Sequence, residues 1–347
     1  MHGLVLFAGL IFFLWLGRGI LIPLLMATFL WYLINAIAAY YRKIMPFRAE
    51  HTRITLLARV FDWIANILSG ATLVLMVYMF VTQIQPMFRE LISAMPDIQY
   101  RITMFGHYIS DTLGIHFDES VIPDMTTIVS HASASAASVL TAIGMIIIYM
   151  LFMFVEQSTF NQKFRALFPN RNRSRKMRYI LDSIDENMKK YMFVKTLVSA
   201  VTGVVSYIWL YQIGLEFAGV WAFIVFITSY IPTIGAIVAC GLPILYAFIS
   251  ASTPQLPILT AGGLISIQIL FGNILEPKLM GKTLNLSTLA ILINMVFWGM
   301  IWGPVGMFFS VPLLVATFII TAQFDSLRWI AILLSADGNI PDKRDDD

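Results

Sequence analysis

A short polar cluster late in the chain holds the residues best suited to chemistry. Its members are Gln268, Asn273, Glu276, Pro277, Lys278 and Gly281. Carboxylate and amide oxygens can hold a proton or a cation, and a neighbouring ammonium group can offset a carboxylate. We therefore expect ion coupling at Glu276 and Lys278, with Glu276 as the carrier, and a substrate path lined by the other four residues. The alternative is a charged helix end that lies at a membrane interface.

A second candidate is the run YIPTIG at 230–235, which interrupts an apolar stretch. Pro232 removes a backbone donor, and Gly235 permits an unwound turn. Within lipid, freed backbone groups are tolerated only against protein or a water-filled cavity, and broken helices form the substrate sites of many transporters. Pro232 and Gly235 are therefore expected to line the path. A purely structural kink is the alternative.

Further helix breakers interrupt the two longest apolar runs, 217–250 and 286–324. We expect helix breaks at Pro243, Gly303, Gly306 and Pro312. Each run is too long for one ordinary membrane-spanning helix. The run 217–250 either spans once or enters and returns as a hairpin.

Enzyme signatures are missing from the sequence. The five histidines show no paired metal-ligand spacing, and neither H-E-x-x-H nor G-x-S-x-G occurs. Gly281-Lys282-Thr283 looks like the end of a phosphate-binding loop, but Glu276 stands where that loop needs its first glycine. We expect a non-enzyme without catalytic residues, a metal site or a cofactor, and with coupling only to H⁺ or Na⁺.

The composition indicates a membrane protein. Apolar residues make up 59% of the 347 residues and charged residues 12%, and the mean hydropathy is +0.79. A soluble domain carries about 25% charged residues, so most of this chain must face lipid. The single cysteine, Cys240, excludes an intrachain disulfide.

Along the chain, about eight hydrophobic stretches are long enough to be considered membrane elements. They are 3–17, 20–41, 64–82, 136–155, 192–211, 217–250, 256–275 and 286–324. We therefore predict an all-α integral membrane protein, with some helices broken or re-entrant and amphipathic helices outside the membrane core. The predicted organisation is N-terminal membrane helices (1–82), an external amphipathic segment (83–135), a C-terminal transport core (136–335) and an acidic cytoplasmic tail (336–347).

The segment 83–135 carries apolar residues at helical steps of three and four, from Ile84 to Leu113. Pro86 and Pro96 are expected to begin or kink these helices. The stripe predicts helices on the outer membrane surface or in a subunit contact. Ordinary packing within the protein is the alternative.

Charge distribution predicts orientation. The loops at 42–59 and 163–178 are rich in Lys and Arg, whereas 83–135 carries more acidic than basic residues. Basic loops lie on the cytoplasmic side, which places the N-terminus there too. The loop at 251–257 lacks Lys and Arg, while 276–285 holds two lysines. These two loops would exchange sides if 217–250 were a hairpin.

Four stretches carry a resemblance to a known family. They are YMFVKTLVS at 191–199, YIPTIG at 230–235 with Pro243 after it, NILEPKLMG at 273–281, and GPVGMFFSVPL at 303–313. With these residues the chain resembles the autoinducer-2 exporter family of bacterial inner-membrane proteins, also called permease-M-like. The order of the motifs in the C-terminal half is specific. The N-terminal half resembles the family in layout alone.

The resemblance implies a protein of the bacterial inner membrane that assembles as a homo-oligomer, with a pentamer as the family expectation. Its partners would be the lipid bilayer and a small molecule or ion, and not nucleic acid. Some members are described as exporters of autoinducer-2, a small hydrophilic furanone derivative used in quorum sensing. Others, with the P-x-x-G that is Pro232 and Gly235 here, are described as sodium/proton antiporters.

Three functions therefore remain open. The first is gradient-driven or facilitative export of a small polar metabolite such as autoinducer-2. The second is monovalent cation/proton antiport, which Glu276 would have to support alone because no aspartate lies deep in a span. The third is a scaffold without transport, for which 83–135 would be the partner surface.

Overall fold

The computed structural model describes residues 2–44, 55–113, 125–157, 159–251, 253–280 and 285–340. These residues form helices, connecting turns and a single isolated antiparallel bridge between Leu286 and Ser335. Four helical segments are long and apolar enough to cross a membrane: Arg18–Ala38, Arg171–Gln212, Gln255–Met280 and Thr288–Ala322. Shorter apolar helices are Thr141–Gln157, Ala218–Thr228 and Ile234–Ser250. The predicted all-α membrane fold is confirmed.

The helices have the following bounds. They are α1 (His2–Leu16), α2 (Arg18–Ile44), α3 (Thr55–Leu113), α4 (Met125–Gln157), α5 (Phe160–Leu167), α6 (Arg171–Gln212), α7 (Ala218–Thr228), α8 (Ile234–Ser250), α9 (Gln255–Gln268), the π-helix η2 (Ile269–Leu275), α10 (Glu276–Met280), α11 (Thr288–Ala322), the 3₁₀-helix η4 (Asp325–Leu327) and α12 (Arg328–Leu334).

The chain forms two compact units. One comprises residues 1–74, 142–195 and 278–347, and the other comprises 75–141 and 196–277. We call them the terminal unit and the hairpin unit. The helices α3, α4 and α6 each contribute to both units.

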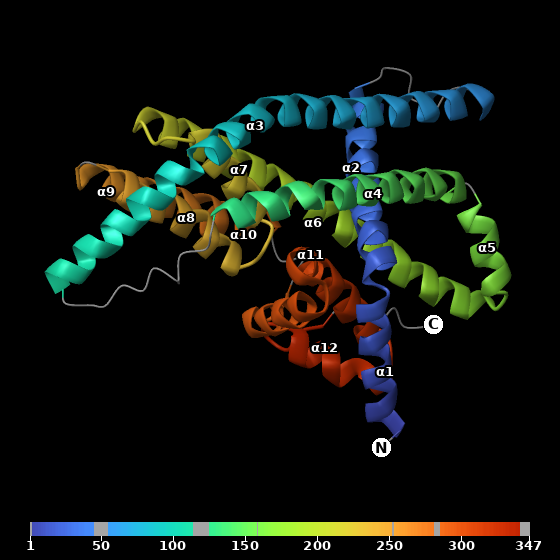
Figure 1. Ribbon diagram of the computed structural model, residues 1–347. Coiled ribbons are helices and arrows are strands. Elements are labelled where there is room, and N and C mark those ends of the chain that lie inside the picture. Colours follow the sequence, from blue (N-terminus) through green and yellow to red (C-terminus); the bar gives the residue numbers. More distant parts are fainter. Residues whose placement is uncertain are drawn as a thin grey trace. The chain divides into compact units, whose positions relative to one another are not determined.

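In the terminal unit, α1 and α2 run end to end (Figure 1). The backbone N–H of Gly17 bonds to Phe13 O at 2.8 Å, and the N–H of Leu21 bonds to Gly17 O at 2.9 Å. Helical hydrogen bonds therefore bridge the expected gap between 3–17 and 20–41. The chain does not reverse there, so these stretches are not an antiparallel pair of spans.

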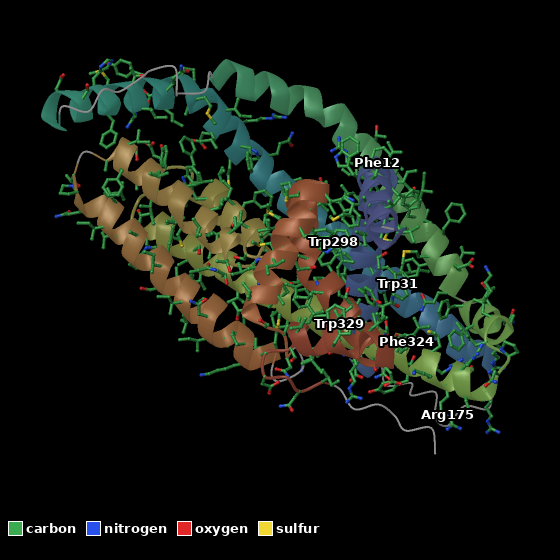
Figure 2. The ribbon with its side chains drawn as sticks, turned by 90° about the horizontal axis from the view of Figure 1, so that it is seen from below. Phe12, Trp31, Arg175, Trp298, Phe324 and Trp329 are labelled. Atoms are coloured by element: carbon green, nitrogen blue, oxygen red, sulfur yellow. The ribbon has the colours of Figure 1, made fainter. Side chains whose placement is uncertain are left out.

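The helix α11 packs against both halves of this rod. Trp302 Nε1 donates to Leu14 O at 3.0 Å, and the Phe29 ring meets the Phe308 ring edge-on at a centroid distance of 5.1 Å. Figure 2 shows Phe12 and Trp31 along the rod and Trp298 on α11. Aromatic side chains thus provide much of this unit's packing.

In the hairpin unit, the apolar stripe of α3 packs into the core. Leu91 and Ile98 are buried in one cluster with residues of α7 and α8, and the Phe88 ring meets the Phe223 ring at 5.8 Å. This stretch of the stripe therefore serves ordinary helix packing. The helix also continues through Pro86 and Pro96, so neither proline begins a helix, and α3 bends along its length (Figure 1). Core contacts follow Pro86 and lie on both sides of Pro96, where they offset the lost hydrogen bond.

Candidate functional site

The run 217–250 forms a helical hairpin. The Tyr246 ring, near the end of α8, lies 5.3 Å from the Trp221 ring and 5.7 Å from the Phe217 ring, at the start of α7. The two ends of the run can meet in this way only if α7 and α8 are antiparallel. The chain therefore turns back between Thr228 and Ile234, as the hairpin alternative expects.

Pro232 and Gly235 form the turn of this hairpin. The N–H of Ile234 bonds to Pro232 O at 2.6 Å across Thr233, whose φ of 58° and ψ of −61° describe the rarer and more strained form of γ-turn. Gly235 is buried, and a Cβ there would meet the carbonyl oxygen of Thr228. The turn therefore requires glycine at this position and stores backbone strain at Thr233.

A second irregularity lies in the helix next to α8. The helices α8 and α9 pack side by side (Figure 1) and are joined by the loop around Thr253. After Gln268, helix α9 continues as the π-helix η2, and the N–H of Glu276 bonds to Phe271 O, five residues earlier. Single π-turns in helices occur often at functional sites. Here the π-turn is seven residues long.

The turn and the π-helix lie at similar distances from the loop that joins α8 and α9. Gly235 is about 23 Å along α8 from Ser250, and Ile269 is about 21 Å along α9 from Gln255, at about 1.5 Å per residue. The antiparallel packing therefore sets the strained turn level with the start of the π-helix. This level of the hairpin unit is the candidate site.

The predicted polar residues occupy different positions around it. The Gln268 side chain is half-buried, and its Nε2 lies 3.0 Å from where a Cβ of Gly272 would stand. Asn273 and Pro277 are exposed, and Glu276 is half-buried. Lys278 is exposed and belongs to the terminal unit, and Gly281 lies outside the described residues. Asn273 thus lies within the π-helix η2, and Gln268 and Glu276 flank it at the end of α9 and the start of α10.

Gly303 and Gly306 form the turn of a second hairpin, within α11. The backbone leaves the helical region at Gly303, with φ 64° and ψ −146°. Asn294 Nδ2 donates to Ser310 O at 2.5 Å, which joins residues on opposite sides of the turn. Gly306 is buried, and a Cβ there would meet the carbonyl oxygen of Trp298.

Pro243 and Pro312 do not break their helices. Both are buried, and α8 and the second half of α11 continue through them. The expectation of a break at these two positions is therefore corrected. A proline inside a membrane helix is tolerated when neighbouring groups satisfy the carbonyl that it frees.

Sequence reasoning missed Glu216, the sole charged residue between Lys195 and Glu276. Its Oε2 accepts a hydrogen bond from Tyr246 Oη at 2.5 Å, and its backbone oxygen accepts one from Trp221 Nε1 at 3.1 Å. Arg101 from α3 interacts electrostatically with Glu216 and donates to Ser250 O at 3.4 Å. We call Arg101, Glu216 and Tyr246 the charged clamp.

The pKa of the Arg101 guanidinium is raised above its ordinary value, chiefly by its hydrogen bond to Asp97, 2.7 Å away. The clamp therefore keeps a fixed positive charge beside Glu216. The isolation of Glu216 in an apolar region was the signal that could have found it.

Lys195 was also missed. It lies in α6 within the stretch YMFVKTLVS, and only 6% of its surface is exposed. An ionisable residue buried in an apolar helix is a candidate functional residue. The lone charge in that stretch could have indicated it.

In the part of the chain that the structure describes, no three His, Cys, Asp or Glu side chains gather to hold a metal ion.

Comparison with known proteins assigns the family. The model of the AI-2E family transporters matches residues 4–326. The AI-2 transport protein TqsA of Escherichia coli K12 is 32% identical over 238 residues, which cover 69% of this chain and 65% of that protein. A putative transport protein of Haemophilus influenzae is 30% identical over 277 residues, 74% of this chain and 77% of that protein.

A third relative, the sodium-lithium/proton antiporter of Halobacillus andaensis, is 30% identical over 206 residues, covering 58% of this chain and 56% of that protein. The chain thus spans less than two thirds of the length of two of these three relatives. The family match covers both hairpins, the π-helix and the charged clamp. The chain belongs to the AI-2E family of transporters, and it is a multi-pass membrane protein.

Proposed function

We propose that the chain exports a small polar metabolite by gradient-driven or facilitative transport, with autoinducer-2 as the first substrate to test. One argument carries this proposal: by helix length, the strained turn at Pro232–Gly235 and the start of the π-helix η2 lie at similar distances from the loop that joins α8 and α9. Both features leave backbone groups outside regular helical bonding, and Gln268 and Asn273 add amide groups nearby. Backbone of this kind serves substrate sites in broken-helix transporters.

The substrate is proposed from the relative that bears the name AI-2 transport protein. In this mechanism the path contains Pro232, Gly235, Gln268 and Asn273. Pro277 and Gly281 remain proposed members of the path by their place in the sequence, and Lys278 remains the proposed partner of Glu276 in ion coupling. Glu276 couples H⁺ or Na⁺ if a gradient drives the step.

The test uses purified protein in liposomes loaded with autoinducer-2. We expect efflux above that of liposomes without the protein. An imposed pH gradient should accelerate this efflux, and Glu276→Gln should return it to the rate measured without a gradient. Glu186→Gln, an exposed carboxylate of α6, is the matched control and keeps the acceleration. Efflux that ignores both the gradient and Glu276→Gln would assign a facilitative path. No efflux above background would refute export of this substrate.

Sodium/proton antiport is the second candidate, favoured by the Halobacillus relative and by a second carboxylate, Glu216, in the hairpin unit. The assay is Na⁺-dependent proton flux in the same liposomes. We expect Glu276→Gln to lose this flux. If both Glu276→Gln and Glu216→Gln keep the full flux, antiport through either carboxylate is excluded.

We propose the bacterial inner membrane as the location, with 163–178 on the cytoplasmic side. We also propose a homo-oligomer, with five subunits as the first number to test by native mass spectrometry. These proposals rest on the family resemblance and on the loop charges. The cytoplasmic N-terminus was predicted with a reversal of the chain between the stretches 3–17 and 20–41. Because α1 and α2 run end to end, that reversal is absent, and the side on which the N-terminus lies stays a prediction.

A further inference from the structure

The helix α5 and the first turns of α6 form a cationic stretch of the terminal unit. Between Gln157 and Leu181 the chain holds seven basic and no acidic side chains. We call residues 160–178 the basic segment. It connects α4 to the apolar part of α6 (Figure 1). Clusters of four to eight basic residues beside a membrane-spanning helix are typical of contacts with anionic lipids.

Aromatic rings contact two cations of the basic segment. The Phe164 side chain is 4% exposed, and its ring lies 5.1 Å from the Arg178 guanidinium. Lys176 Nζ lies 5.1 Å from the Phe324 ring, which comes from the C-terminal part of the unit. Lys163 forms an ion pair with Glu156. These contacts use three of the seven cations for internal packing.

Three arginines at the start of α6 keep their charges exposed. Arg171, Arg173 and Arg175 are exposed, and none of them forms an ion pair with a carboxylate among the residues that the structure describes. Figure 2 shows Arg175 at the edge of the terminal unit. Arg171 and Arg175 lie one helical turn apart on one face of α6, Arg173 lies on the opposite face, and all three are exposed to solvent or headgroups.

The terminal unit also exposes large apolar side chains. Leu167 at the end of α5 is 73% exposed, and Trp329 on α12 is 61% exposed. A soluble surface rarely combines large exposed apolar residues with dense positive charge, but the membrane interface suits both, because apolar groups enter the acyl boundary while cations meet phosphates.

We propose that the basic segment binds the headgroups of anionic phospholipids in the membrane that carries the protein, through Arg171, Arg173 and Arg175. Guanidinium groups recognise phosphate oxygens in a bidentate manner, and this favours arginine over lysine at such contacts. The segment thereby fixes the cytoplasmic ends of α4 and α6 at the headgroup layer. This inference is independent of the transported substrate.

The test is native mass spectrometry of the purified full chain, titrated with phosphatidylglycerol or with phosphatidylcholine of the same acyl chains. We expect tighter binding of phosphatidylglycerol. Each basic residue near an anionic surface contributes about fivefold, so Arg173→Gln with Arg175→Gln should reduce the preference on the order of 25-fold. Arg173→Lys with Arg175→Lys should keep most of it, because the charge remains.

The matched control is Arg18→Gln with Arg89→Gln, which removes the same net charge from two exposed positions outside the basic segment. We expect this variant to keep the lipid preference. Equal binding of both lipids by the unchanged protein would overturn the proposal, and so would an equal loss in the control. Inorganic phosphate at millimolar concentration should not displace the lipid, and displacement would show that the segment binds free phosphate instead.

Discussion

Gly235 follows Pro232 by three residues, and Gly306 follows Pro304 by two. The two glycines therefore hold comparable places in the two hairpins. A Cβ at either position would meet a backbone carbonyl, that of Thr228 or that of Trp298. Contact with backbone cannot be relieved by a side-chain rotation. Each hairpin can therefore close to its observed separation only because these side chains are absent.

We predict that Gly235→Ala destabilises the protein by about 3 kcal/mol, the upper end for overpacking, because the new methyl group displaces backbone. Gly241→Ala is the control, since it lies in the same helix and its Cβ would meet nothing within 4 Å. Alanine there should be neutral or stabilise by up to about 1 kcal/mol. The measurement is thermal unfolding in detergent, and equal melting temperatures for the two variants would contradict the close approach at Gly235.

The charged clamp permits a second prediction at this scale. Tyr246→Phe removes the hydrogen bond to Glu216 and should cost about 1.5–2 kcal/mol, as expected for a bond to a charged group whose partner stays partly solvated. Tyr211→Phe, at a side chain that is 70% exposed, should change little. In a double-mutant cycle, Glu216→Gln should add little further loss to Tyr246→Phe. Additive losses would show that the two side chains do not act as a pair.

At the scale of the elements, hydropathy and periodicity predicted which segments are helical. The predicted stretches 64–82, 136–155, 192–211 and 256–275 all lie within helices of the structure. Turn chemistry also marked both hairpin turns, at Pro232–Gly235 and Gly303–Gly306. These features are local, and local sequence carries them.

What sequence could not supply was which elements reverse and which continue. Pro86 and Pro96 look like helix ends, yet α3 continues through both, and its residues from Met87 to Ile102 pack into the core of the hairpin unit. Arg18-Gly19 looked like a loop, yet hydrogen bonds bridge Gly17. The charged clamp joins residues from 101 to 246, and no local pattern predicts a contact over that separation.

The C-terminal segment gives a prediction for pH. The pKa of Asp337 is lowered from 3.8, chiefly by the hydrogen bond from the Asn285 side chain and then by those from Asn339. A carboxyl group whose pKa is lowered in the folded state stabilises that state above its unfolded pKa and stops doing so as the pH falls through the folded value. Docking of this segment on the residues before α11 should therefore weaken only below pH 3.8.

Hydrogen exchange at the amides of Gly338 and Asn339, corrected for intrinsic rates, measures this docking. Both amides donate to side-chain oxygens in the folded segment. We expect constant protection of these amides above pH 3.8 and loss of protection below pH 3.8. Asp337→Asn should remove the pH dependence, and a midpoint above pH 5 would contradict the role of Asp337.

At the scale of the whole molecule, the hairpins bear on membrane topology. With 163–178 in the cytoplasm, α6 ends outside, and the α7–α8 hairpin begins and ends there. If α9 with η2 then returns the chain, Lys278 would lie in the cytoplasm, as the distribution of basic residues favours. A hairpin in α11 that enters from the cytoplasm returns the C-terminal segment to the same side.

We predict, in a Cys240→Ser background, that a cysteine at Thr253 reacts with a membrane-impermeant maleimide from outside intact cells. Cysteines at Lys278 and Ala336 should react only after permeabilisation. The opposite pattern at Thr253 and Lys278 would show that 217–250 crosses the membrane once. Thr253 and Ala336 are exposed, so a lack of reaction reports sidedness and not burial.

The length of α7 also has a consequence for biosynthesis. Its 11 residues extend about 16 Å, roughly half of a hydrocarbon core of about 30 Å. A helix this short cannot leave the translocon as an independent span, because its ends would place unpaired backbone groups in lipid. It must remain in a protected environment until α8 has emerged, so these two helices enter the bilayer together. Integration of this part of the protein therefore follows the pace of translation through Ser250.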